Sequence, residues 1–472
     1  MRLFDTHIQE LKYEVIKELI KSYDNQTLDV AYRDIPKIIV PGPEAKMRCC
    51  IYKERAILQE RIRLAMGGDK DNPTAVEVID IACDECPAEG IFVTPACRGC
   101  LAHRCKDACP KDAISIVNHR AVVDKEKCIE CGKCVAACPY NAIIKQQRPC
   151  IVSCKAGAIS LDENKKAVIN RNKCISCGAC VYQCPFGAIS DKSMILEVLD
   201  LLKASDHSKN YRVYAVIAPS IVSQFKYAKI EQVVTGIMQL GFHQVVEAAL
   251  GADICLYKEV HEFAEKGTLT TSCCPAFVMY VEKNFPELKP YISSSLSPMC
   301  QAALLIKKSD PTAKVVFIGP CSAKKVEYKL EKTMGAIDSV LSFEELQAFL
   351  DARGIDAATL PETALDNASY YGRIFAKAGG ITQGIVHIAK EQGVEGLNPI
   401  SMNGIDQIKV NMLKLKLKRA EHNFFEGMAC EGGCINGALC LNHGPKNALD
   451  VDKYGNEARE KTIENSVKLF KL

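Results

Sequence analysis

The side chains in this sequence with the clearest capacity for chemistry are its cysteines, which number 26 among 472 residues. Many of them follow the spacing Cys-x2-Cys-x2-Cys-x3-Cys-Pro, or a close variant of it, within residues 97–185. In this pattern three neighbouring thiolates hold one [4Fe-4S] cubane, and the fourth cysteine binds a second cubane. Cysteine pairs with this short spacing also suit zinc, but whole four-cysteine blocks that end in Cys-Pro favour iron–sulfur clusters.

Pairing the cysteine blocks by this crossing rule gives the ligands of the predicted accessory cubanes. The first two sets are Cys97, Cys100, Cys105 and Cys138, and Cys109, Cys128, Cys131 and Cys134. The third set is Cys154, Cys174, Cys177 and Cys180. Cys150 and Cys184 then lack two partners, which Cys83 and Cys86 would supply in a fourth set. The sequence therefore predicts three accessory [4Fe-4S] clusters and leaves a fourth open.

The composition of the chain restricts its class and its partners. A hydrophobic fraction of 48% and a charged fraction of 25% are those of an ordinary globular protein. We find no signal-peptide pattern and no apolar run long enough for a bilayer, so we expect a cytoplasmic protein without membrane insertion, whose thiols stay reduced. The formal net charge of +3 excludes a strongly basic nucleic-acid binder. If about twenty cysteines bind iron as thiolates, the chain itself carries a charge of about −17, so the formal charge says little about partners.

The elements that must position these cysteines divide the chain into four predicted regions. Residues 1–80 form a helical N-terminal extension, with helical patterns over 10–22 and 53–66, to which we assign no function. Residues 81–149 form an α+β module like a bacterial ferredoxin with two [4Fe-4S] clusters, and residues 150–200 form a second, degenerate module of this kind. Residues 210–472 alternate apolar strands with helices, which predicts an α/β domain with mostly parallel sheets.

Three further cysteine loops lie in this last region: TSCCPAFV (271–278), GPCSAKKVE (319–327) and EGMACEGGCINGA (426–438). The first opens a helix, the second follows a buried strand, and the third is a glycine-rich turn in which the backbone can approach a bulky group. Cysteines from three separated loops indicate a further iron–sulfur or metal centre at one end of the sheet.

These three loops resemble the signature motifs of the iron–iron ([FeFe]) hydrogenases, and the match extends through much of residues 211–440. The resemblance implies an H-cluster, in which a [4Fe-4S] cubane is joined through one cysteine to a diiron subcluster with CO, CN and azadithiolate ligands. It implies that Cys274, Cys321, Cys430 and Cys434 hold the cubane, with Cys434 as the bridge. The implied activity is reversible hydrogen oxidation and proton reduction, with electrons relayed through the accessory clusters to or from a ferredoxin or similar small carrier. Hydrogenase maturation proteins are the other implied partners, and an anaerobic bacterium is the implied source.

The resemblance also assigns roles to side chains around the cluster. Cys273 matches the proton-donating cysteine, and Glu259, Glu262 and Ser293 match the groups that carry protons to it. Without this context, the two glutamates would be read as solvated residues of a charged helix. Lys324 matches the lysine that binds a cyanide ligand, and Pro219, Ser220 and Met428 match residues that surround the diiron centre.

Several positions depart from the common catalytic group of this family. They are Ala276, Phe277, Met299, Gly319 and the run 437–439. The departures resemble the less-studied group B, and they leave the implied ligands and proton donor intact. The alternatives are a hydrogen sensor and a non-catalytic, hydrogenase-like iron–sulfur protein. The cysteines left without a role are Cys49, Cys50, Cys255, Cys300 and Cys440.

Overall fold

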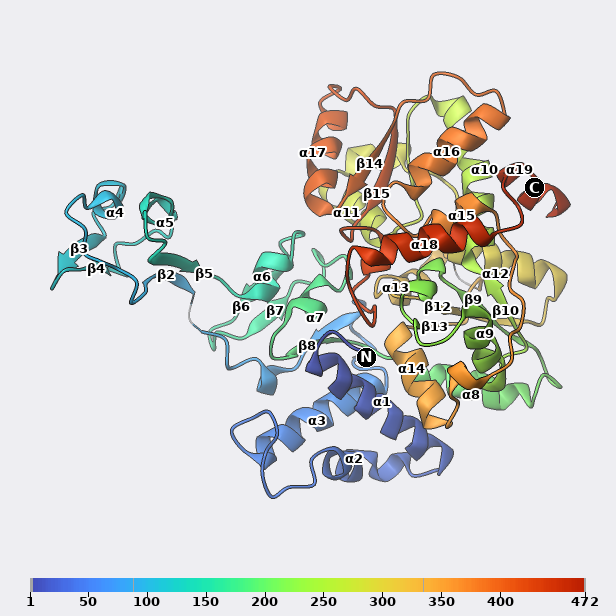
Figure 1. Cartoon of the computed structure of the whole chain (residues 1–472), viewed down its shortest axis with the longest axis horizontal. Helices are drawn as coiled ribbons and strands as arrows, with labels where there is room; N and C mark the ends of the chain where they lie inside the picture. Colours follow the sequence, from blue (N-terminus) through green and yellow to red (C-terminus); the bar gives the residue numbers. More distant parts are fainter. Residues whose placement is uncertain (1–2, 88, 334, 471–472) are drawn as a thin grey trace.

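The computed structural model describes residues 3–87, 89–333 and 335–470. Its main body contains two small parallel sheets covered by helices, and a narrow arm carrying β2, β3, β4 and β5 extends from one side of this body (Figure 1). Within the described residues, none of the helices combines the length and the apolar character needed to span a membrane.

The N-terminal extension has helices at α1 (His7–Asp24), α2 (Ala31–Ile39) and α3 (Ile51–Ala65). The predicted patterns correspond to α1 and α3, while α2, which contains Pro36, was not predicted from the sequence. A capping box formed by Thr6 and Gln9 begins α1. The buried face of α1, including Leu19 and Ile20, belongs to the same apolar core as the larger sheet. The extension is therefore part of the main body.

One ferredoxin-like module is inserted into the sequence of the other. We call the inserted module, which lies on the arm in Figure 1, the outer module, and the other one the inner module. The outer module, residues 90–146, contains β2 (Gly90–Val93), α4 (Arg104–Asp107), β3 (Ile114–Val117), β4 (Arg120–Val123), α5 (Lys133–Ala137) and β5 (Ile143–Gln146). The inner module, residues 76–86 and 149–191, contains β1 (Val76–Val78), α6 (Pro149–Ser153), β6 (Ile159–Leu161), β7 (Ala167–Ile169), α7 (Ala179–Gln183) and β8 (Ile189–Asp191). Because β1 pairs antiparallel with β8, the segment around residue 81 packs with the inner module and not with the outer one, to which the sequence prediction had assigned it.

The remaining residues form an α/β domain with two parallel sheets. The larger has the order β10 (Gln244–Glu247), β9 (Val213–Ile217), β12 (Lys314–Ile318) and β13 (Ser339–Leu341). The smaller has the order β11 (Leu269–Thr270), β15 (Phe424–Met428) and β14 (Pro399–Asn403). All of these pairs are parallel, as the alternation of strands and helices predicted.

Helices cover both of these sheets (Figure 1). They are α8 (Ile195–Ser205), α9 (Ile230–Gln239), α10 (Ala248–Lys266), α11 (Pro275–Asn284), α12 (Pro298–Ser309), α13 (Lys324–Glu327), α14 (Phe343–Ala352), α15 (Tyr370–Ile374), α16 (Gly380–Glu391), α17 (Ile405–Lys416), α18 (Lys446–Glu457) and α19 (Ile463–Val467). The long helix α10 packs against α12, α15, α16 and α19, so its inward face lies at the centre of the domain.

Candidate functional site

The three cysteine loops of the α/β domain meet because each follows a parallel strand. Cys274 lies between β11 and α11, Cys321 lies between β12 and α13, and Cys430 and Cys434 follow β15. The loops that leave β11 and β15 lie at one edge of the smaller sheet, where sites of α/β proteins are found, and the loop that leaves β12 comes from the larger sheet. The long crossovers between these strands thus bring cysteines that are far apart in the sequence to one place.

The thiols of these loops are buried close to one another. Burial raises the pKa of Cys434 to about 12, and the neighbouring thiols of Cys321 and Cys274 contribute to the rise. Burial also raises the pKa of Cys430, and the neighbouring thiols of Cys321 and Cys274 raise it further. Thiols with a raised pKa stay protonated, so a positive group must bind here before Cys430 and Cys434 become thiolates. This donor set is the one that an iron–sulfur cluster uses.

A small cavity of about 70 Å³ lies beside these thiols. Its lining residues include Pro219, Cys273, Lys324, Met428 and Cys434. The sequence prediction had placed each of these side chains around one group, and the structure brings them to one cavity.

Lys324 supplies a fixed cation at this cavity. Burial acts to lower the pKa of its ammonium group, but the Glu327 carboxylate, with its oxygen 2.5 Å away, holds that pKa above its usual range. The ammonium also donates a hydrogen bond to the carbonyl of Cys273 at 3.2 Å. The Ser220 hydroxyl, buried beside Pro219, has no hydrogen-bond partner among the residues that the structure describes. A cation and a spare hydroxyl suit a group with anionic ligands.

Two glutamates on α10 connect this site with the surface. Glu262 is partly exposed, binds Lys266, and accepts a hydrogen bond of 2.8 Å from the hydroxyl of Ser293. Glu259 is buried one turn earlier in the helix, and burial raises its pKa to about 8, against the lowering effect of the Ser272 backbone amide, which donates to its Oε1 at 3.4 Å, and of the nearby Ser293 hydroxyl. Of its two oxygens, Oε2 has no partner within the described part of the chain.

The glutamates lie in an order that can pass a proton inward. The Ser293 hydroxyl donates to Glu262 on the outer side. On the inner side it lies close enough to Glu259 to lower the pKa of that carboxyl. Burial raises the pKa of the Cys273 thiol, and Glu259 is the neighbour that raises it most. The four residues to which the resemblance assigns the proton route thus lie near one another, from the partly exposed Glu262 to the buried Cys273.

The predicted accessory ligand sets also come together in space. One space in the outer module is lined by Cys97, Cys100, Cys105 and Cys138, and another by Cys109, Cys128, Cys131 and Cys134. In the inner module, Cys154, Cys174, Cys177 and Cys180 line a larger space. Burial raises the pKa of Cys150 to about 11, and the thiols that raise it further are those of Cys184, Cys86 and Cys83. Within the described ranges, no group of three or more His, Cys, Asp or Glu side chains is arranged to hold a single metal ion.

A repeated backbone contact shows that these cysteines suit the thiolate form. In four blocks the amide of an alanine four residues later donates to the cysteine sulfur, at 3.2–3.3 Å, and the pairs are Ala113 to Cys109, Ala142 to Cys138, Ala158 to Cys154 and Ala188 to Cys184. Hydrogen bonds to cluster sulfurs stabilise the anionic ligand and help to set its potential. In these four blocks the donor is the alanine of the Ala-Ile pair that ends the block.

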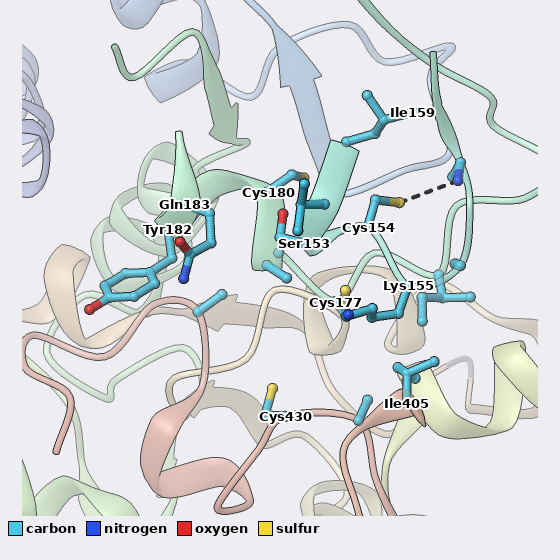
Figure 2. Close-up of a pocket in the computed structure, with 18 of the residues that line it drawn as sticks. Ser153, Cys154, Lys155, Ile159, Cys177, Cys180, Tyr182, Gln183, Ile405 and Cys430 are labelled. Carbon is cyan, nitrogen blue, oxygen red and sulfur yellow. Dashed lines mark hydrogen bonds between the residues drawn. The ribbon is translucent and has the colours of Figure 1, made fainter. Parts of the chain in front are cut away.

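The inner module faces the α/β domain across a cavity of about 640 Å³. Figure 2 shows Cys154, Cys177 and Cys180 on one side of this cavity and Cys430 on the other. Cys177 is also close enough to Cys430 to raise its pKa, after the effects of burial, Cys321 and Cys274. The third accessory set and the set of the α/β domain are thus neighbours.

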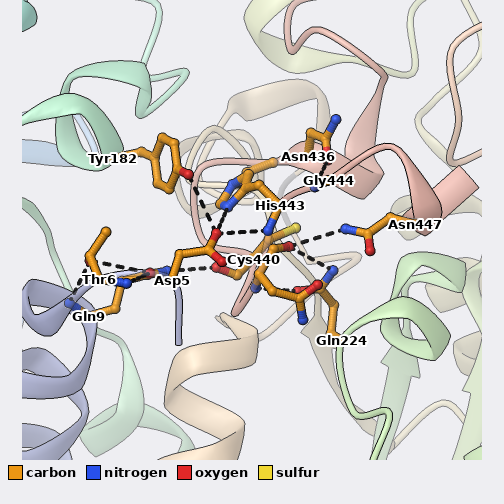
Figure 3. A network of polar contacts seen from close by, with 12 residues as sticks. Asp5, Thr6, Gln9, Tyr182, Gln224, Asn436, Cys440, His443, Gly444 and Asn447 are labelled. Carbon is orange, nitrogen blue, oxygen red and sulfur yellow. Dashed lines mark hydrogen bonds and ion pairs between the residues drawn. The ribbon is translucent and has the colours of Figure 1, made fainter. Parts of the chain in front are cut away.

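A polar network that was not predicted from the sequence joins this region to the N-terminus (Figure 3). The Asp5 carboxylate accepts hydrogen bonds of 2.8 Å from both the backbone amide and Nδ1 of His443, and the Tyr182 hydroxyl donates to it at 3.4 Å. The rings of Tyr182 and His443 lie 4.0 Å apart, and Nε2 of His443 faces the carbonyl of Gly437 at 3.0 Å. No local motif could have revealed this network, because its members are far apart in sequence.

Two cysteines that the sequence left without a role are also built into the site. The Cys440 thiol is buried and donates to the carbonyl of Ile435 at 3.4 Å, close to Cys434. The Cys255 thiol is buried on α10 and donates to the carbonyl of Leu296 at 3.1 Å. By contrast, Cys49 and Cys50 are exposed.

Known proteins share both halves of this arrangement. The model of the iron-only hydrogenase large subunit, C-terminal domain, matches residues 211–438, and the 4Fe-4S binding domain matches residues 121–144 and 167–190. Iron hydrogenase 1 of Clostridium pasteurianum is 29% identical over 74% of this chain and 70% of its own length. The periplasmic [Fe] hydrogenase large subunit of Nitratidesulfovibrio vulgaris is 30% identical over 68% of this chain and 86% of its own length. The cytosolic Fe-S cluster assembly factor NAR1 of Eremothecium gossypii is 25% identical over 50% of this chain and 68% of its own length.

Proposed function

The chain belongs to the iron-only hydrogenase family, and from that premise we propose that it catalyses the reversible reaction of two protons and two electrons to H2. The observation that carries the proposal is the cavity beside Cys434, because a proton donor, a fixed cation and a cluster ligand all line it. We place the protein in the cytoplasm of an anaerobic bacterium, where its many thiols would stay reduced. The departures at Ala276, Phe277 and Met299 support assignment to group B.

The residues fit an H-cluster. Cys274, Cys321, Cys430 and Cys434 would hold its cubane, and the cavity lined by Lys324, Pro219 and Met428 would hold the diiron part. When bound, this cofactor supplies the metal chemistry that makes and cleaves H2. The ammonium of Lys324 provides a fixed positive charge for an anionic ligand, and the largely apolar walls exclude water.

The protein's own contribution to the reaction is to move protons. Glu262 exchanges protons with solvent, and the Ser293 hydroxyl passes them between Glu262 and Glu259. Because burial raises the pKa of Glu259 to about 8, this carboxyl holds a proton at neutral pH and can pass it to the Cys273 sulfur once the thiol has given up its own proton. Titratable groups placed within hydrogen-bond reach are what general acid–base chemistry requires.

The cysteine sets of the two modules provide the route for electrons. We propose that each of the four sets holds a [4Fe-4S] cubane, including the fourth set of Cys83, Cys86, Cys150 and Cys184. The proximity of Cys177 to Cys430 makes the third set the last step before the H-cluster. A ferredoxin or similar small carrier would deliver or remove electrons at the far end, and maturation proteins would insert the diiron part.

The similarity to an Fe-S cluster assembly factor supports a second candidate function, a non-catalytic iron–sulfur protein without the diiron part. The two candidates differ in what the cavity beside Cys273 contains. The chain should be matured without oxygen in the presence of the maturation proteins, and its infrared spectrum and hydrogen evolution with reduced methyl viologen should be measured. We expect bands of metal-bound CN and CO together with turnover. Intact cubanes without such bands would favour the assembly-type role, and bands with negligible turnover would favour a hydrogen sensor.

A further inference from the structure

The outer module contains two of the proposed cubane sites, and either could meet an electron carrier. The module stands away from the main body on the narrow arm, so its surface is open on several sides (Figure 1). Exposure alone does not distinguish the two sites, because Cys131 of the second set is exposed while Leu101, next to Cys100 of the first set, is 97% exposed. The composition of the two rims does distinguish them.

The rim of the first set is basic and apolar. Arg98, Arg104 and Tyr140 line the space that holds its cysteines, and the described lining residues include no carboxylate. Both arginines are exposed, and Tyr140 is 55% exposed. Leu101, between the two arginines in the sequence, adds a second exposed apolar side chain at this rim. Exposed apolar side chains flanked by positive charges are the composition of a protein-docking surface.

The rim of the second set is less basic, since the described residues that line its space include one cation, Lys111, and neither an arginine nor a carboxylate. The segment before Cys134 contains Lys127 and Lys133, but also Glu126 and Glu130, and all four are exposed. Ile129 is the exposed apolar residue of this segment, at 57%. Since the charges of this segment cancel, the second rim would attract a charged partner more weakly than the first.

We propose that Arg98, Leu101, Arg104 and Tyr140 form the docking surface for a small acidic electron-transfer protein, and that the first cubane set exchanges electrons with it. We name this surface the arginine rim. The inference rests on the proposed function for the direction of electron flow, and it adds the port and the charge of the partner. In hydrogen evolution, one electron passes from the reduced partner to the oxidised cubane at each encounter, and no bond forms or breaks. Carboxylates of the partner would pair with the two arginines, and its apolar contact would cover Leu101 and Tyr140.

The test is the affinity of the cluster-loaded full chain for an oxidised bacterial ferredoxin of net negative charge, measured by calorimetry at low salt. For the double variant Arg98→Glu and Arg104→Glu we expect the Kd to rise by about tenfold or more, because two attractions become repulsions. Salt should raise the Kd of the unaltered chain, since it screens exposed charges. Leu101→Ser should weaken binding at low and high salt alike, because this change removes apolar contact and no charge.

The matched control reverses two charges at the other rim, Lys127→Glu and Lys133→Glu. This variant should bind the ferredoxin nearly as the unaltered chain does. The proposal is overturned if the control loses as much affinity as the arginine variant, if the arginine variant loses none, or if the unaltered chain does not bind the ferredoxin at low salt. Because binding is measured without turnover, it is independent of the proposed function, which hydrogen evolution with reduced methyl viologen tests separately.

Discussion

The two ferredoxin-like modules use one cysteine motif in opposite environments. Gly132 begins α5 of the outer module with φ 78°, and Gly178 begins α7 of the inner module with φ 76°. A side chain added at Gly132 would meet nothing within 4 Å, whereas at Gly178 it would lie 2.5 Å from the Ser322 hydroxyl and 2.7 Å from Ala438. The backbone of the motif is therefore conserved between the modules, while the surroundings differ completely.

The contacts around Gly178 show what the inner module gains from this packing. The Ser322 hydroxyl, next to Cys321, donates to the carbonyl of Ser176 at 2.6 Å. Lys283 on α11 donates to the carbonyl of Cys174 at 2.6 Å. Burial and hydrogen bonding set the potential of an iron–sulfur cluster, and exposure sets its access to partners. One motif therefore has exposed surroundings in one module and buried surroundings in the other. Under the proposed function, the exposed copy would exchange electrons with a partner and the buried copy would pass them to the α/β domain.

The largest effect should come from the buried end of the route, where every electron donor depends on the same side chain. Cys273→Ser should reduce hydrogen evolution by about 10²–10⁴-fold with both ferredoxin and reduced methyl viologen, because a proton-transfer group is lost. Iron content should be unchanged, since Cys273 is not among the proposed ligands. Cys49→Ser, at an exposed cysteine, is the control. Near-normal evolution in Cys273→Ser would remove this residue from the relay.

The next effect concerns the buried carboxyl that feeds Cys273. Glu259→Gln should slow hydrogen evolution by about 10²-fold with either donor, because an amide cannot transfer the proton. In the unaltered chain the protonated form of Glu259 is present below pH 8 and is lost above it, so evolution should fall as the pH rises through about 8. Rates measured across this range, with the exposed Glu265→Gln as control, test the prediction. A variant that keeps the rate and the decline of the unaltered chain would contradict it.

The same substitution has a consequence for stability with a defined sign. The folded pKa of about 8 lies above the ordinary value of 4.5, so the folded chain retains a proton that the unfolded chain releases. The contribution of Glu259 to stability therefore falls as the pH rises from 4.5 to 8. Urea unfolding should show a weaker loss of stability over this range in Glu259→Gln.

The matched glycines test the comparison of the modules directly. Gly132→Ala and Gly178→Ala both place a side chain at a positive φ, which costs about 1–2 kcal/mol. Only Gly178→Ala also overpacks against Ser322 and Ala438, which adds about 1–3 kcal/mol. Urea unfolding of both variants measures the difference, and only Gly178→Ala should slow turnover driven by the dye. Equal losses in the two variants would show that the inner module is not packed as described.

The smallest effect should come from the N-terminal contact with the inner module. Asp5→Asn weakens the bonds to His443 and Tyr182 while it keeps the shape of the side chain, so it should cost about 1–2 kcal/mol. Thermal unfolding should show this loss, and the exposed Glu44→Gln should not. No difference between the two variants would mean that the extension contributes little to the junction.

Much of the site could be predicted from the sequence alone, because the cysteines that bind an iron–sulfur cluster follow a short, regular spacing. The spacing of the cysteine blocks gave the ligand sets, and three short loops gave the family and the candidate residues Cys273 and Lys324. The spacing could not show that the cysteines of the fourth set lie together, because Cys83 is separated from Cys150 by the whole outer module. For the same reason it gave no role to residues 1–80, whose helix α1 shares the core of the larger sheet.

What the sequence determined by itself is the chemistry, since the type and local spacing of cysteines dictate which cofactors a chain can bind. What only the tertiary structure decided is the environment of each group. Burial raised the pKa of Glu259, and neighbours from distant segments made Gly178 crowded and Gly132 free. Asp5, Tyr182 and His443 met at one junction. The physical reason is that solvation and electrostatic interactions depend on distance in space, and a local motif does not specify which distant segments will surround it.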